Sequence, residues 1–423
     1  MNVLSFLSSL DLVTFVLLFW YTAVLDLPRY TIGALIVAIA ALFSWPRPRP
    51  HLASLPSVSV LLVGHNEEKV LRTCVASLWE QTIAQGGGPP MEVIVVDDGS
   101  TDAMYDVARA LQAQGWIHKA FRLHYRGGKS AGVNMAIGAA KNDIVIIADI
   151  DTTFDRDAFE IILGYFDDPA VGAVSGNIGV RNAEASLVAR HQAIEYCIGI
   201  SLGRRIMDVL GILSIVSGAF GAFRRQALDE VGRQDVEVGE DADLTMKLRR
   251  AGWRIRFAPE ARALTDVPVT LTQLTGQRMR WDRGLITIWT RKFRGALDPR
   301  RVTFQIADAM VIADILLFQI ALALVFPVYM VWLFYAVGDL AITVIVTTLI
   351  AYAVLDLLAF LTAAALDGGR LLGLAVYMPF YTAMQISIMR LIRIVAIMQE
   401  LIFRSSYRDP YVPERVMQVV ERV

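Results

Sequence analysis

The sequence predicts an α/β domain with a largely parallel sheet, inserted between membrane-spanning helices. Of the 423 residues, 55% are hydrophobic and only 19% are charged, which is too apolar for an ordinary soluble protein. Long apolar stretches lie near both ends, whereas the middle carries enough charge for a soluble domain. In that middle, short apolar runs alternate with helix-forming segments, as in parallel sheets. We therefore divide the chain into residues 1–50, 51–300 and 301–423.

Charge and cysteine content exclude several classes of protein. The net charge of −1 provides no global field for nucleic acid, so we expect no nucleic-acid partner. Cys74 and Cys197 lie far apart and have no spacing typical of a zinc site. We expect two buried thiols rather than a disulfide or a metal centre.

Residues 1–50 contain two apolar stretches, at 12–25 and 30–45. Each is short for a bilayer core of about 30 Å, so they form either a tight pair of spans or a shallow re-entrant hairpin. Asp11 stands where a signal peptide would carry basic residues, which argues against a cleaved leader. Residues 46–50 form a stiff basic linker, which the positive-inside rule places in the cytoplasm.

Residues 51–300 show the alternation of strands and helices in detail. Three strands, each too apolar to alternate and so buried on both faces, are predicted at residues 57–63, 92–96 and 143–148. Helices are predicted at residues 69–80, from Ser100 onward, and at 126–140. Open sheets of this kind bind ligands beyond the carboxyl ends of their strands, so the residues that follow each strand are the candidates for function.

Paired aspartates follow two of these strands. Asp97 and Asp98 either hydrogen-bond a base and ribose, with phosphate at the next helix start, or form an Asx turn that caps that helix. Asp149 and Asp151 lie at i and i+2, on one face of an extended chain. Their oxygens suit Mg²⁺ or Mn²⁺, and the alternative is a solvated strand end. Together the two pairs suit a cation that carries a phosphorylated ligand, such as a nucleotide sugar.

Two further charged motifs stand at predicted helix starts. Residues 126–129 form a small cationic loop ending in Lys129, whose glycines would let a phosphate approach, although the spacing is not that of a Walker A loop. Glu240, Asp241 and Asp243 precede an amphipathic segment. They either complement the helix macrodipole, or Asp241 takes the proton of an attacking acceptor hydroxyl.

Residues 277–281 lie just before the carboxyl-terminal apolar region. The planar guanidinium groups of Arg278 and Arg280 suit diphosphate oxygens, and Trp281 offers a face for a sugar ring. The alternative is a basic and aromatic anchor at a membrane interface.

Residues 301–423 are strongly apolar. Three stretches are long enough to span a bilayer, at residues 307–336, 340–366 and 371–389. Acidic residues such as Asp314 and Asp356 interrupt them, and at membrane depth these must face protein or water. Arginines after the last stretch favour a cytoplasmic end, which two spans before the domain and three after it would not give. Either one long segment is split, or the last helix lies flat.

In this order, the motifs resemble the family 2 glycosyltransferases, in particular the membrane-embedded synthases of cellulose, chitin, hyaluronan and poly-N-acetylglucosamine. The resemblance covers nearly the whole chain and is specific through its combination rather than through any single motif. The matching segments are residues 95–100, 126–129, 149–151, 217–225, 239–241 and 277–281. It implies a GT-A fold and an inverting transfer from a UDP-sugar that yields β-linkages.

The resemblance also implies a role for each candidate residue. Asp97, Asp98, Lys129 and Asp149 would bind the nucleotide sugar, and Asp149 and Asp151 would hold Mg²⁺ or Mn²⁺. Asp241, with Glu240 beside it, would be the catalytic base. The residues expected at the acceptor and the diphosphate are Gln277, Arg280, Trp281, Ser217, Gly218 and Phe220. The residues 239–241 read Gly-Glu-Asp where cellulose synthases usually carry Thr-Glu-Asp, which disfavours a strict cellulose assignment.

The expected protein is a multi-pass enzyme of the bacterial inner membrane with its catalytic domain in the cytoplasm. It would add a hexose or N-acetylhexosamine to the non-reducing end of a growing polysaccharide and pass the product through the membrane. One alternative is a single transfer to a lipid acceptor, and another is an inactive domain on a transporter or scaffold. Membrane lipids are expected partners, while an accessory subunit or an oligomer stays open.

Overall fold

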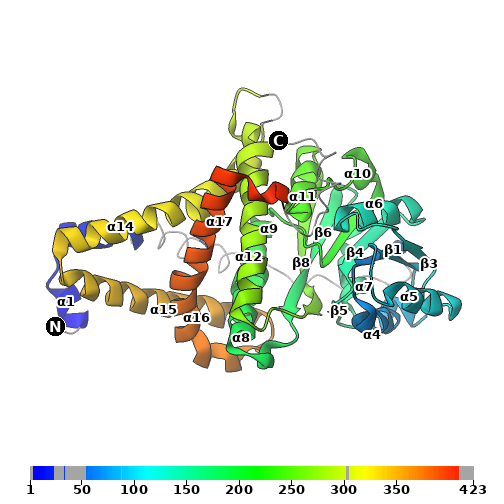
Figure 1. Ribbon diagram of the computed structural model, residues 1–423, viewed down its shortest axis with the longest axis horizontal. Helices are drawn as coiled ribbons and strands as arrows, with labels where there is room; N and C mark the ends of the chain where they lie inside the picture. The colour runs from blue at the N-terminus through cyan, green and yellow to red at the C-terminus, as the bar shows by residue number, and fades with distance from the viewer. Residues whose placement is uncertain (1–2, 23–32, 34–53, 87, 302–303, 409–423) are drawn as a thin grey trace.

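The computed structural model describes residues 3–22, 33, 54–86, 88–301 and 304–408. One eight-stranded sheet between layers of helices forms the part of the molecule on the right in Figure 1. The strands are β1 (Val58–Gly64), β2 (Met91–Asp97), β3 (Lys119–Arg122), β4 (Ile144–Asp149), β5 (Thr153–Phe154), β6 (Val171–Val180), β7 (Phe220–Arg224) and β8 (Arg254–Thr265). Their order across the sheet is β3-β2-β1-β4-β7-β6-β8-β5. The α/β prediction is confirmed, and so are its three apolar strands.

The sheet is mixed rather than largely parallel. Strands β3, β2, β1 and β4 are parallel, but β7 runs antiparallel to both β4 and β6, and β5 is antiparallel to β8. The chain enters β7 from the carboxyl end of β4, where the Asp149 amide donates a hydrogen bond to the Ala219 carbonyl oxygen at 3.4 Å. Starting at that edge, β7 can only run back along β4, and the residues before it are left at the edge where ligands bind.

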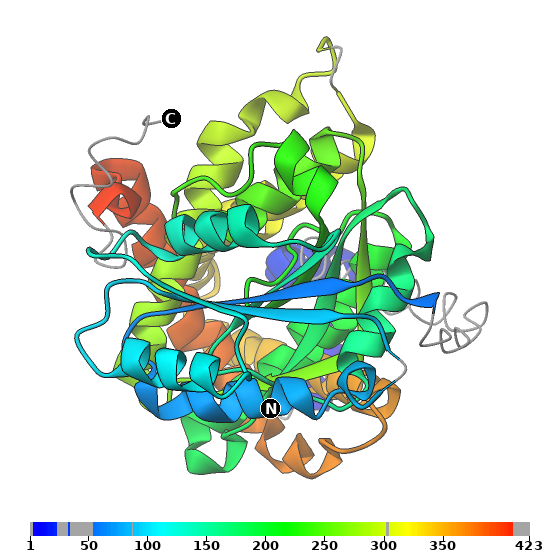
Figure 2. The same cartoon turned by 90° about the vertical axis from the view of Figure 1, so that its right-hand side faces the viewer.

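Helices cover both faces of the sheet (Figure 2). On one face lie α4 (Glu68–Trp79), α5 (Met104–Ala113) and α7 (Ala158–Leu163), and on the other α6 (Lys129–Ala139), α10 (Arg225–Glu230) and α11 (Glu240–Arg250). In β1, Val60 and Leu62 belong to the first core, whereas Leu61 and Val63 belong to the second. A strand that is buried on both faces must be apolar at every position, which explains the unbroken apolar runs.

The remaining segments of the central region lie toward the helical end of the molecule (Figure 1). They are α8 (Leu187–Glu195), η6 (Tyr196–Leu202), α9 (Gly203–Val209), α12 (Leu271–Ile286), η7 (Thr287–Lys292) and η8 (Arg294–Leu297). The short turns within the sheet domain are η3 (Thr82–Ala84), η4 (Gly164–Asp167) and η5 (Ala183–Ala185). Helix α12 begins with a capping box, in which Thr270 and Gln273 bond each other's backbone amides.

Two apolar helical segments extend from this end as a hairpin (Figure 1). The first joins α13 (Ile306–Asp314), η9 (Ile315–Ala321) and α14 (Leu322–Val337), and the second is α15 (Leu340–Leu366). Among the described residues these are the two helices long and apolar enough to cross a membrane. Near the hairpin's far end pack α1 (Val3–Ser8) and α2 (Leu12–Trp20), which covers part of the predicted stretch 12–25. The predicted stretch 30–45 and the linker 46–50 fall outside the described residues.

The third predicted stretch, 371–389, does not form such a helix. It folds as η10 (Leu372–Tyr377), α16 (Met378–Met384) and η11 (Gln385–Met389), and continues as α17 (Arg390–Phe403) and η12 (Ser405–Arg408). Helix α17 packs along α12, across the direction of the hairpin (Figure 1). The two alternatives for this region were a split segment and a last helix that lies flat. The structure favours the second, because α17 lies across the base of the hairpin.

Ion pairs tie both ends of the hairpin to the sheet domain. At its start, the buried Asp308 pairs with Arg249 of α11 at 2.9 Å. At its end, Asp367 pairs with Arg205 of α9 at 3.1 Å, and its carbonyl oxygen accepts a hydrogen bond from Arg262 of β8 at 2.8 Å. Both feet of the hairpin therefore stand on the same side, next to the sheet domain.

Candidate active site

The carboxyl ends of three parallel strands place the first candidate residues side by side. Strand β1 lies between β2 and β4, with Gly64 paired with Asp97 and Val63 with Asp149. The two aspartate motifs therefore flank β1 at the same edge of the sheet, as expected for strands of this kind.

Asp97 and Asp98 both hold the backbone of this edge in place. The buried Asp97 carboxylate accepts a hydrogen bond from the Ser100 amide at 2.9 Å and pairs with Arg122 at 3.2 Å. Asp98 accepts hydrogen bonds from the amides of Gly127 at 2.6 Å and Gly128 at 3.0 Å. Asp97 thus holds the turn after β2 without capping α5, which begins at Met104, while Asp98 fixes the cationic loop beside the strand end.

Lys129 connects this loop to β4. Its ammonium forms an ion pair with Asp149 and donates a hydrogen bond to the Gly218 carbonyl oxygen at 3.1 Å. Burial alone would lower the pKa of Lys129, but the charges of Asp149, Glu240 and Asp241 hold it above its usual range. Lys129 is therefore a fixed positive charge among carboxylates.

Gly218 brings the Gly-Glu-Asp motif to the same point. A Cβ at Gly218 would lie 3.0 Å from the Lys129 Nζ and 3.9 Å from the Asp241 Cβ, so a side chain there would crowd both. Asp241 follows Glu240 at the start of α11 and accepts a hydrogen bond from the Ala242 amide at 2.8 Å. Burial and the Asp241 charge both raise the pKa of Glu240. The structure thus joins Asp149, Lys129, Gly218 and Asp241, which are far apart in sequence.

Asp151 lies beside Asp149 in the turn after β4. Its carboxylate accepts hydrogen bonds from the hydroxyls of Thr265 at 3.1 Å and Thr152 at 3.3 Å. Burial and the Asp149 charge raise the pKa of Asp151. Among the described residues, no group of three or more His, Cys, Asp or Glu side chains is arranged to hold a metal. The carboxylates of Asp149 and Asp151, two positions apart in the chain, nevertheless fit a cation whose other ligands come from a diphosphate and water.

Glu67 is a site residue that the sequence analysis missed. It follows β1 at the same edge, and burial together with the charges of Asp151 and Asp149 raises its pKa to about 7. Its position beside Asp149 and Asp151 makes Glu67 a candidate for the same site. The available signal was its place just after an apolar strand, where Asp98 and Asp149 were selected.

Helix α12 presents the residues 277–281 differently from expectation. Arg278, rather than Arg280, is buried; it forms an ion pair with Glu195 of α8 and lies 4.2 Å from the centre of the Trp281 ring. Trp281 itself is 39% exposed, so its ring is accessible to a ligand. Gln277 and Arg280 are half-buried. Arg278 of this motif thus orients the tryptophan and is itself held by Glu195.

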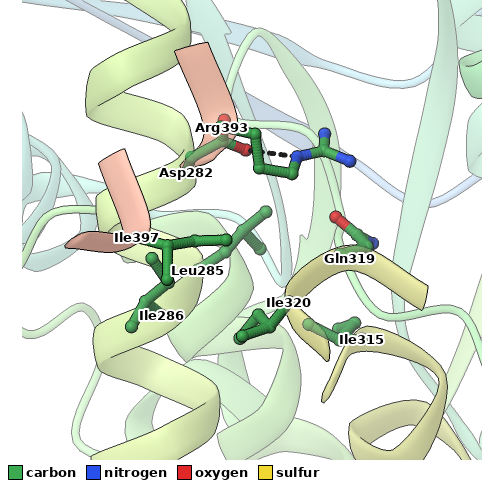
Figure 3. A pocket seen from close by; sticks show the side chains of 8 residues that line it. All are labelled: Asp282, Leu285, Ile286, Ile315, Gln319, Ile320, Arg393 and Ile397. Carbon is green, nitrogen blue, oxygen red and sulfur yellow. Dashed lines mark hydrogen bonds and ion pairs between the residues drawn. The ribbon is translucent and has the colours of Figure 1, made fainter. Parts of the chain in front are cut away.

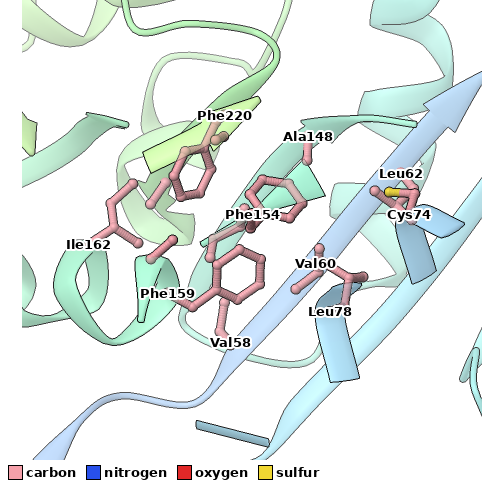
Figure 4. Packing of buried hydrophobic residues seen from close by; sticks show 14 of the residues in the cluster. Val58, Val60, Leu62, Cys74, Leu78, Ala148, Phe154, Phe159, Ile162 and Phe220 are labelled. Carbon is pink, nitrogen blue, oxygen red and sulfur yellow. The ribbon is translucent and has the colours of Figure 1, made fainter. Parts of the chain in front are cut away.

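The residues before and in β7 divide between the site and the core. Ser217 is buried, and its amide donates to the Ser175 hydroxyl at 3.3 Å, which also accepts from Arg204 at 2.9 Å. Phe220 has no exposed surface and packs in an aromatic cluster with Phe154 and Phe159 (Figure 4). The strand pleat thus turns the Phe220 ring into the core and away from the edge where Gly218 lies.

A pocket is formed where α12 meets both the hairpin and α17 (Figure 3). An ion pair of 3.3 Å between Asp282 and Arg393 borders it. Its lining residues are Asp282, Leu285, Ile286, Ile315, Gln319, Ile320, Arg393 and Ile397. The pocket does not include any of the carboxylates at the sheet edge, so it is separate from the candidate site.

Comparison with known proteins defines the class. Residues 59–232 match the family described as glycosyl transferase family 2. A mannosyltransferase from Pyrobaculum calidifontis, solved in complex with GDP-Man and Mn²⁺, has a similar fold, with a TM-score of 0.60 and 21% identity over 89% of this chain and 96% of that one. This likeness confirms the fold predicted from the sequence.

The curated relatives include poly-beta-1,6-N-acetyl-D-glucosamine synthases from staphylococci. The synthase of Staphylococcus aureus (strain COL) is 29% identical over 258 residues, 60% of this chain and 61% of that one. The synthase of Staphylococcus epidermidis is 29% identical over 260 residues, 61% of each chain. In strain MSSA476 of Staphylococcus aureus the identity is 30% over 262 residues. The chain thus spans about three fifths of the length of these relatives.

Proposed function

We propose that this protein is an inverting glycosyltransferase that moves an N-acetylhexosamine or hexose from a UDP-sugar to the non-reducing end of a β-linked polysaccharide. The observation that supports it is the meeting of Asp149, Lys129, Gly218 and Asp241 at one edge of the sheet. UDP-N-acetylglucosamine is the leading donor, because the curated relatives are named as synthases of a polymer of that sugar. The Gly-Glu-Asp motif also argues against cellulose.

The donor side of the proposed site is formed by strand ends. Asp149 and Asp151 would hold Mg²⁺ or Mn²⁺, and Asp98 with Asp97 would shape the pocket for uridine through the backbone that they fix. When bound, the cation would neutralise negative charge on the departing UDP. The Lys129 ammonium supplies a second, permanent positive charge beside it, in a site where burial strengthens its effect.

The acceptor side of the proposed site is formed by α11 and α12. Asp241 would take the proton of the attacking hydroxyl as the new bond to the anomeric carbon forms and the bond to UDP breaks. Burial and the Asp241 charge raise the pKa of the adjacent Glu240, which makes Glu240 the less suitable of the two acids to act as the base. Trp281 would stack on the acceptor sugar, Ser217 and Gly218 would border it, and Gln277 and Arg280 would contact acceptor or diphosphate.

The membrane placement follows from the hairpin. Residues 306–337 and 340–366 would cross the bacterial inner membrane, with the sheet domain in the cytoplasm next to both feet. Such an arrangement would let the growing polymer leave the site directly into the membrane region. A single transfer to a lipid remains the competing outcome of the test below.

The test is to assay purified, detergent-solubilised protein for UDP release with a panel of UDP-sugars, with Mg²⁺, Mn²⁺ or a chelator. We expect turnover with UDP-N-acetylglucosamine and divalent cation, little turnover with chelator, and a product of many sugars that a hexosaminidase degrades. One sugar per lipid would overturn the polymer proposal. No cation-dependent turnover with any UDP-sugar would overturn the enzyme proposal and favour an inactive scaffold.

A further inference from the structure

Lys292, the last residue of η7, is surrounded by three carboxylates. Its ammonium lies 2.7 Å from the Asp235 carboxylate, 3.0 Å from that of Glu237 and 2.7 Å from that of Asp243. The Lys292 side chain is only 16% exposed and Asp243 is not exposed at all. A single buried ammonium with three acidic neighbours is more than a surface ion pair, whose energy is usually small.

All three carboxylates belong to the segment that carries the proposed base. Asp235 and Glu237 lie in the loop between α10 and α11, and Asp243 lies in the first turn of α11. Between them stand Glu240 and Asp241. Lys292 itself ends the helical run formed by α12 and η7, and Trp281 lies in the α12 part of that run. The Lys292 side chain therefore joins α11, which carries the proposed base Asp241, to the helical run that carries Trp281, the residue proposed to bind the acceptor.

At the same junction, the backbone of the loop before α11 packs closely against the helical run that contains Lys292. Gly284, Ile288 and Lys292 follow one another at intervals of four along the helical run, so they share one side of it. A Cβ at Gly284 would lie 2.7 Å from the Val238 carbonyl oxygen, and a Cβ at Gly239 would lie 2.8 Å from Ile288. Gly239 has a φ of +90°, in the left-handed region that favours glycine. The chain thus runs directly against the helix just before Glu240.

The three carboxylates explain why this junction needs a positively charged side chain. Besides Lys292, the neighbouring Lys247 of α11 pairs with Asp235 at 3.0 Å, but it does not pair with Glu237 or Asp243. Burial raises the pKa of Asp243 to about 6, Lys292 opposes this rise, and the charges of Glu237 and Asp235 add to it. Without Lys292, Asp243 would be a buried carboxylate facing two other acids, and it would take up a proton or move.

We propose that Lys292 is a positioning residue for sugar transfer, gathering Asp235, Glu237 and Asp243 so that Asp241 is held beside Gly218. The inference rests on the proposed function, since it assigns to Lys292 the alignment of the proposed base. Lys292 touches neither the donor carboxylates Asp149 and Asp151 nor Lys129 in the contacts of the described residues. It should therefore govern the rate of transfer rather than the binding of the donor.

The experiment compares Lys292→Met, Lys292→Arg and Lys247→Met by UDP release, product formation and UDP binding between pH 5 and pH 9. For Lys292→Met we expect kcat to fall about 100-fold, the loss typical of a misplaced catalytic group, with the KM for the UDP-sugar within about 3-fold. The acidic limb of its kcat–pH profile should move to higher pH, because Asp243 loses the charge that lowers its pKa. Lys292→Arg should recover most of the rate and the original acidic limb, and Lys247→Met should stay near the wild type.

An unchanged kcat, an unmoved acidic limb, or an equal loss in Lys247→Met would overturn the role of Lys292. If Lys292→Met does not fold, Asp243→Asn keeps the lysine and removes one partner; a normal kcat in that variant would overturn the role equally. Wild-type protein without turnover on any UDP-sugar would instead overturn the proposed function, and the inference with it. An active wild type with an unaffected Lys292→Met overturns the inference alone.

Discussion

Lys129 and Asp149 form an ion pair across the edge of the sheet, and the same ammonium donates a hydrogen bond to the Gly218 carbonyl oxygen. This pair unites the cationic loop, the strand end and the segment before β7. In the proposed mechanism it supplies positive charge next to the departing diphosphate, where a preorganised charge needs no rearrangement during the reaction.

Replacing Lys129 by Met should lower kcat/KM for the UDP-sugar by about 100-fold, because one preorganised positive charge is lost. Lys129→Arg keeps the charge but not the compact shape, so it should recover activity only partly. Steady-state UDP release measures both variants. Near-normal activity in Lys129→Met would show that the ion pair is structural only.

Replacing Asp241 by Asn should abolish transfer while UDP still binds. The amide cannot take the acceptor proton, and a lost general base costs about 100- to 10,000-fold. The residues proposed to bind UDP at the strand ends are untouched by the change. Isothermal titration with UDP and Mn²⁺, followed by incorporation of labelled sugar, separates the two effects. A variant that extends acceptor at the normal rate would assign the base elsewhere.

Glu67 predicts a pH-dependent stability. Its pKa is about 7 in the folded protein against an ordinary value of 4.5, so protonation favours the folded state. The stabilisation is complete below about pH 4.5 and is lost as pH rises through about 7, by on the order of 1 kcal/mol after allowance for solvent screening. Glu67→Gln removes this loss. Its melting temperature should therefore exceed that of the wild type more at pH 8 than at pH 5, without divalent cation; an equal difference at both pH values would contradict the raised pKa.

The sequence predicted those features that depend on local pattern. Apolar runs predicted β1, β2 and β4, and helices follow each of them, although α5 begins at Met104, four residues after the predicted Ser100. Because parallel strands end at one edge, the placement of Asp98 and Asp149 at the same edge of the sheet followed from the fold class.

Features that depend on distant pairing could not be predicted. Arg278 is buried because Glu195, 83 positions away, receives it, and nothing at residues 277–281 distinguishes it from Arg280. Phe220 resembled a site residue because it follows Ser217 and Gly218, but the antiparallel course of β7 turns its ring inward. Lys292 had no motif, since its three carboxylates come from the loop before α11 and from the first turn of α11, far before it in the sequence.

The close approach of α12 and the loop before α11 predicts opposite effects for two similar substitutions. Gly284→Ala would place a methyl group 2.7 Å from the Val238 carbonyl oxygen, so we expect a loss of about 1–3 kcal/mol in stability and a displaced Gly-Glu-Asp segment with reduced kcat. Gly276→Ala, on the same helix, meets no atom within 4 Å and should stabilise by up to about 1 kcal/mol. Thermal melts and UDP release compare the pair. Equal behaviour of both variants would contradict the contact.

The hairpin predicts which loops face each side of the membrane. The turn at Asp339 is exposed at the far end of α14 and α15, whereas Arg370 follows Asp367, which is tied to Arg205 of the sheet domain (Figure 1). The two native cysteines are buried, so background labelling should be low.

In spheroplasts, a membrane-impermeant maleimide should label Asp339→Cys at once and Arg370→Cys only after permeabilisation. The reason is that the 27-residue, mostly apolar α15 rises about 40 Å, more than the bilayer core of about 30 Å, so that in the proposed spanning arrangement its two ends emerge on opposite sides. Arg301→Cys, which precedes the first apolar segment, should behave like Arg370→Cys if the hairpin enters and leaves on the cytoplasmic side. Labelling of Asp339→Cys and Arg370→Cys from the same side would show that the hairpin does not span the membrane, and the proposed exit of polymer would lose its structural basis.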